Sequence, residues 1–126
     1  MDSVFDVFDE VSYQFLKISR GGVYGNIILQ TYDAVGVADI DEGMITANNQ
    51  EAYQSSSLLY VHPDEEYITE ITENGKVNFV GNGIRVDHKD YEIVGSGVGR
   101  NQDNGTVEHF ELTLQAADFS EYQETS

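Results

Sequence analysis

The chain has 126 residues, which fits one domain and leaves no room for two of ordinary size. Hydrophobic residues make up 40% of it, so a buried core is expected and wholesale disorder is excluded. It has no cysteine, which excludes disulfides and thiolate metal sites. Twenty-three acidic residues against six basic ones give a net charge of −17, and such a surface repels nucleic-acid phosphates and anionic lipid heads.

The first ten residues are predicted to form a short helix or arm. Ser3 and Asp6 have the spacing of a capping box, which favours a helix over residues 3–9. A strand is expected to follow as far as Ile18, because apolar and polar residues alternate there. The Arg-Gly-Gly run at 20–22 is expected to end this strand.

Further strands are predicted from short runs of β-branched and aromatic residues that turn residues separate. They cover residues 23–37, 55–62, 77–79, 84–86, 91–94 and 106–115, with a short strand or helical turn at 67–72. In the last run Phe110, Leu112 and Leu114 face one way, and polar neighbours face the other. The pattern predicts a mainly β fold, a small antiparallel β-barrel or sandwich with a short N-terminal helix.

The predicted core draws on the apolar positions of these strands. Its members are Leu59, Val61, Phe79, Ile84, Val86, Tyr91, Ile93, Phe110, Leu112 and Leu114. We therefore expect one domain over residues 1–126, with a β core at 11–116 and a frayed polar tail at 117–126.

Four connections are predicted between these elements. Residues 39–49 are expected to form a loop, Asn74-Gly75 a tight turn, and residues 87–90 a short hairpin loop. The segment from Gly95 to Gly105 is expected to be a long glycine-rich loop.

No group of side chains has the spacing of a catalytic or metal site. His62, His88 and His109 share no ligand spacing, and the Gly-rich run at 95–99 lacks the following helix and the lysine of a phosphate loop. We therefore expect no enzymatic activity, no cofactor and no metal. A hydrolase or metal-dependent enzyme stays open as an alternative class.

The acidic residues are spread along the chain, with two denser patches. These patches are Asp39, Asp41 and Glu42, and Asp64, Glu65 and Glu66. A solvated, soluble surface explains them as well as the two functional alternatives taken together, which are a surface past which DNA slides and an acidic mimic of DNA.

Membrane insertion is not expected from the sequence. No stretch approaches the roughly 20 apolar residues that cross a bilayer. The acidic residues 1–6 differ from the basic start of a secretory signal. We therefore expect a protein made in the cytoplasm and kept there, or built into a particle that is assembled there.

A stretch in the second half resembles small minor capsid proteins of tailed phages, the head-closure or head-tail joining group. The resemblance begins with the run AYQSSSLLYVHPDE at residues 52–65 and covers roughly residues 50–115. It continues through residues 80–86, 91–95, 99–101 and 105–114.

This resemblance implies a β-barrel-like subunit without catalytic residues, in a ring below the portal. The ring, 12-fold by implication, would contact itself, the portal or adaptor and the tail-side proteins, and DNA would pass through it transiently and without sequence preference. The protein would be part of the virion, assembled in the host cytoplasm.

Two sets of residues are candidates for this role. The first set is an assembly element in the predicted loop: Gly95, Gly97, Gly99, Arg100, Asn101, Asp103 and Gly105. The second set consists of the two acidic patches, 39–42 and 64–66, which would line the channel.

Overall fold

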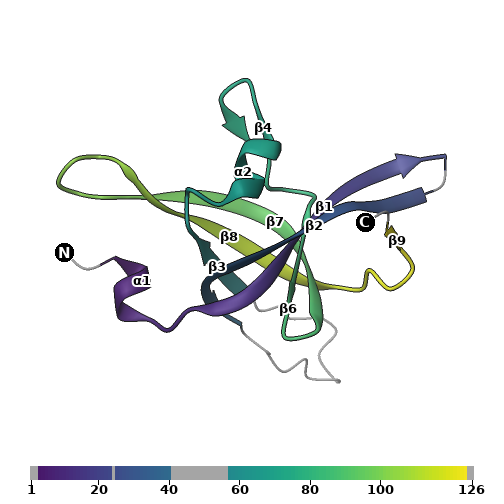
Figure 1. The fold of residues 1–126 in the computed structure, drawn as a ribbon, viewed down its shortest axis with the longest axis horizontal. Helices are drawn as coiled ribbons and strands as arrows, with labels where there is room; N and C mark the ends of the chain where they lie inside the picture. The colour runs from purple at the N-terminus through teal and green to yellow at the C-terminus, as the bar shows by residue number, and fades with distance from the viewer. Residues whose placement is uncertain (1–2, 24, 41–56, 125–126) are drawn as a thin grey trace, which may run out of the picture.

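A computed structural model describes residues 3–23, 25–40 and 57–124 of the chain, and most of them lie in β-strands (Figure 1). The predicted fold class, mainly β with a short N-terminal helix, is confirmed. The elements are α1 (Val4–Val7), β1 (Val11–Gly22), β2 (Gly25–Asp39), β3 (Ser57–Val61), α2 (Glu66–Glu70), β4 (Thr72–Glu73), β5 (Lys76–Val77), β6 (Gly83–Val86), β7 (Lys89–Arg100), β8 (Val107–Ala117) and β9 (Gln123–Glu124).

The main sheet closes on itself. Its strands follow the order β1-β6-β7-β8-β3-β2, each paired antiparallel with the next, and β1 also pairs with β2. The short β9 joins the far side of β2 in parallel. The closed circuit leaves two hairpin ends that extend on opposite sides, the β7–β8 end and the β1–β2 end (Figure 1).

The capping box of the N-terminal helix is present, with Ser3 and Asp6 in the expected roles. The helix is shorter than predicted, because Phe8 already has extended backbone angles. The expected break at residues 20–22 is wrong. β1 continues through Gly22 because β2 runs beside it. The pairing has one register shift between Lys17 and Ile18 and a second between Ser19 and Gly22, at the Arg-Gly-Gly run.

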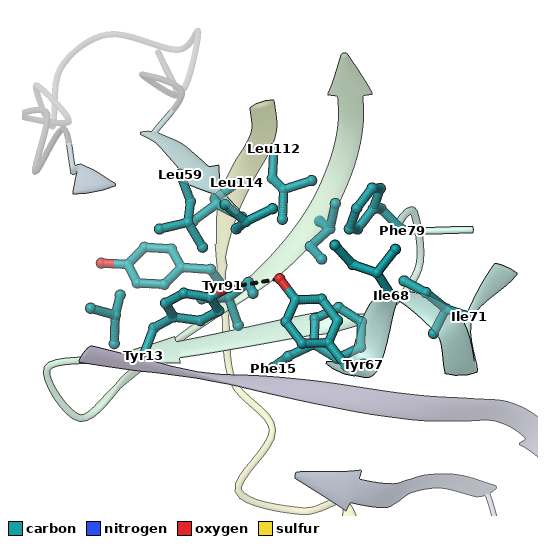
Figure 2. Packing of buried hydrophobic residues seen from close by; sticks show 14 residues of the cluster. Tyr13, Phe15, Leu59, Tyr67, Ile68, Ile71, Phe79, Tyr91, Leu112 and Leu114 are labelled. Carbon is teal, nitrogen blue, oxygen red and sulfur yellow. Dashed lines mark hydrogen bonds between the residues drawn. The ribbon is translucent and has the colours of Figure 1, made fainter. Parts of the chain in front are cut away.

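The core fills the inside of this circuit (Figure 2). Nine of the ten predicted core residues are buried, and the tenth, Phe110, is partly buried against them. Other members come from β1, α2 and the residue after α2, and the sequence analysis missed them: Tyr13, Phe15, Tyr67, Ile68 and Ile71. The helix α2 therefore contributes to the core, through Tyr67 and Ile68.

A second, smaller cluster lies outside the main core. Phe119 is 3% exposed and contacts Leu16 and Ile28, both fully buried. The predicted frayed tail at 117–126 is therefore wrong as far as Glu124. The side chains of Phe119 and Tyr122 and the β9 pairing hold this segment against the sheet.

The predicted Asn74-Gly75 turn is confirmed, and the predicted hairpin loop at 87–90 is present but shorter, because Lys89 and Asp90 already pair in β7. Asn74 and Gly75 both have positive φ angles and connect β4 to β5. Asp87 and His88 also have positive φ angles, and they form a two-residue turn between β6 and β7.

Candidate assembly surfaces

The predicted loop from Gly95 to Gly105 is mostly a two-stranded arm, so that prediction is wrong. β7 continues to Arg100 and β8 begins at Val107, which leaves a connection of residues 101–106. The register pairs each glycine of β7 with a residue of β8: Gly95 with Thr113, Gly97 with Glu111 and Gly99 with His109. The three glycines are paired strand positions, and Gly95 and Gly99 each border a register shift of the β7–β8 pair.

The reason for a glycine is clearest at position 99. A Cβ atom there would collide with the ring of His109, which lies over the Gly99 backbone. Glycine at position 99 therefore lets the His109 ring lie close to the backbone of β7. The sequence analysis took the same glycines as the sign of a flexible loop.

The tip of the arm satisfies its own polar groups. Asn101 donates its backbone N–H to the Thr106 carbonyl, and its own side-chain oxygen accepts the N–H of Asp103. Arg100 donates to the carbonyl of Gly105, whose φ of 74° suits glycine. The seven assembly candidates therefore divide into strand positions and an ordered tip.

The first acidic patch is described only at Asp39. This residue is exposed at the end of β2, opposite Leu58 of β3. Asp41 and Glu42 lie outside the described residues.

The second acidic patch, residues 64–66, lies at the start of α2. The Glu65 carboxylate accepts the backbone N–H of Val35, and partial burial raises the pKa of Glu65. Val35 precedes Asp39 by four strand positions, roughly 13 Å. Asp39 and the second patch therefore lie along one stretch of β2 at separate positions.

A shallow cleft of about 530 Å³ lies between the middle of the β1–β2 hairpin and the β6–β7 turn. Its charged lining comprises Asp33, Glu65, Arg85, Asp87 and His88. Arg85 forms an ion pair with Asp90, with Arg85 Nε 2.7 Å from Asp90 Oδ1, and this contact raises the pKa of the guanidinium. Among the described residues of this lining, no hydrogen bond joins a nucleophile to a base.

Two of the histidines hold the N-terminal helix. The ring of His62 stacks on Phe5 with centroids 3.6 Å apart, and His109 meets Phe5 edge-on at 6.4 Å. Glu108 accepts the backbone N–H of Val4 at 3.2 Å. These contacts dock α1 on β3 and β8.

The third histidine, His88, lies in the β6–β7 turn, away from this cluster. Within the described ranges, no three His, Cys, Asp or Glu side chains group as metal ligands would.

No helix in the described part of the chain is long and apolar enough to cross a membrane. Comparisons with protein families, with curated proteins and with solved structures find no match for this chain. Its function must therefore be argued from its own residues.

Proposed function

We propose that this chain is a structural protein of a tailed-phage virion, a subunit of the head-tail connector ring through which DNA passes. The observation that carries the proposal is the β7–β8 arm, which extends beyond the closed core (Figure 1). The phage-like runs fall on β3, β6, β7 and β8, so the resemblance concerns this arm and the strands beside it.

An arm of this kind suits assembly better than chemistry. Its far end encloses little of the chain's own core, and Val98 on it is 49% exposed. Apolar side chains on a projecting ribbon gain burial only against a neighbour. The partners proposed are further copies in a ring, a portal or adaptor on one side and tail proteins on the other.

The net charge of −17 suits a conduit for DNA. Two charges about 4 Å apart in water interact by only ~1 kcal/mol, and physiological salt screens them over about 8 Å. A ring repeats every carboxylate in each subunit, so the summed field prevents DNA from adhering to the wall. The candidates for the inner wall are Asp39, Asp41, Glu42, Asp64, Glu65 and Glu66.

The first test asks whether the virion contains the chain and where the chain lies in the neck. Mass spectrometry of purified virions that carry this gene should find the chain in a fixed ratio to the portal protein. A structure of the neck should then place the two acidic patches on the inner wall. Virions that lack the chain would refute the proposal, and patches on the outer wall would refute their role.

The second test neutralises the described patch. Virions with Asp64→Asn and Glu66→Gln should assemble in normal numbers and eject DNA more slowly, most visibly at low salt. The control is Asp9→Asn with Glu121→Gln, which removes the same charge from exposed positions elsewhere. Equal ejection rates for the two variants would contradict the channel role.

A further inference from the structure

The outer edge of β7 has no strand partner over residues 94–100, within the described residues. β6 pairs with β7 only over residues 89–92. Ile93 then exchanges backbone hydrogen bonds with Gly81 and Asn82. A register shift between Ile93 and Gly95 follows, and residues 94–100 pair only with β8 on their other side. Their outer edge thus presents unpaired backbone groups.

The side chains at this edge do not block pairing. Val94 and Val98 are 43% and 49% exposed, and Val80 beside them is 59% exposed. Val80 lies near the start of this edge, because the next residue, Gly81, donates its backbone N–H to the Ile93 carbonyl. Natural sheets protect such edges with lysine, proline or a covering helix, and no lysine or proline occurs in residues 94–100.

Charge indicates which partner fits. A chain with net charge −17 repels its own copies wherever acids face each other. Residues 94–99 contain no charged side chain, and the next residue, Arg100, is positive. Two copies can therefore approach along this run without opposing carboxylates on it.

We propose that the β7 edge, residues 94–100, pairs antiparallel with the same edge of a second copy of this chain. Full overlap sets Gly97 against Gly97 and keeps the two Arg100 side chains at opposite ends. The pairing buries Val94 and Val98 and joins the two sheets through main-chain hydrogen bonds. This two-fold contact differs from the contacts between neighbours in a cyclic ring, which join two different surfaces, and it stands independently of the proposed function.

The association should be visible with the purified chain. Sedimentation velocity should show a monomer–dimer equilibrium that shifts toward dimer in about 1 M salt, where screening acts within about 3 Å. Val98→Lys should weaken dimerisation at least about tenfold, because a lysine there would lie in the paired edge. Val35→Lys is the control, since Val35 is 44% exposed on β2 away from the edge.

A cross-link reports the geometry directly, because the chain has no cysteine. A Cβ at Gly97 would meet nothing within 4 Å, so Gly97→Cys should fold normally. Facing residues of an antiparallel pair lie about 4.5–5.5 Å apart, within disulfide reach. Oxidation should therefore give a covalent dimer from Gly97→Cys and little from Val35→Cys.

Each of these experiments has an outcome that overturns the proposal. A wild-type chain that stays monomeric both at low salt and in about 1 M salt would do so. So would a Val98→Lys dimer as tight as the wild type, or equal cross-linking at positions 97 and 35. If Val98→Lys fails to fold, the cysteine pair still decides.

Discussion

Tyr13 and Tyr67 meet inside the core, with hydroxyl oxygens 2.7 Å apart (Figure 2). Tyr67 also stacks on Phe15, with ring centroids 4.1 Å apart. The hydrogen bond satisfies both hydroxyls in a place where an unpaired one would cost about 1–3 kcal/mol. It therefore links β1 to α2 with a specific geometry.

Burial raises the pKa of Tyr13 and of Tyr67 above the ordinary value of 10.0. Below about pH 10 both tyrosines are neutral in either state, so their contribution to stability is fully present. Above it the unfolded chain loses these protons first. The free energy of unfolding should therefore fall as the pH rises above about 10, as urea titrations can measure.

The control is the double variant Tyr13→Phe with Tyr67→Phe, which removes both hydroxyls together. Its stability should fall less steeply over the same pH range. An unchanged slope would mean that other tyrosines carry the effect.

Phe119 is the most deeply buried side chain of the C-terminal segment. Phe119→Ala should lower the free energy of unfolding by about 3–5 kcal/mol, because it empties the space over Leu16 and Ile28. Ser120→Ala, at an exposed neighbour, should change it by less than about 0.5 kcal/mol. Denaturant titration of both variants checks this, and equal stabilities would contradict the packing.

The sequence predicted those elements whose pattern is local. The alternation in β8 and the Asn74-Gly75 turn contain their own information, so both were predicted correctly. Phe119 stands alone in a polar run, and its partners Leu16 and Ile28 are about a hundred residues earlier. No local pattern reveals such a contact.

The prediction of a loop at residues 95–105 was wrong for a different reason. Gly95, Gly97 and Gly99 resemble a loop by composition, yet β8 supplies the pairing that keeps them extended. The sequence analysis thus assigned these residues the wrong backbone state, and their role in assembly stays a prediction. The acidic patches were visible as composition, while the contact of Glu65 with Val35 depends on where α2 lies against β2.

The charge of the whole molecule opposes compactness. Raising the salt from about 0.01 M to about 0.15 M shortens the screening length from about 30 Å to about 8 Å, which weakens repulsion among the acids. The melting temperature should therefore rise with salt. The variant Glu70→Gln with Glu121→Gln, at exposed positions, should show a smaller rise. A melting temperature that falls with salt would mean that ion pairs outweigh repulsion.

The closed circuit of strands also determines how the chain can fold. The β1–β2 hairpin and the β6–β7–β8 meander each form from residues close in sequence, whereas the β1–β6 and β3–β8 seams join distant segments. Closing such distant contacts requires loop-closure entropy before any core is enclosed. The two local units should therefore form early and the seams late. Losing either seam opens the same core, so unfolding should occur in one cooperative step.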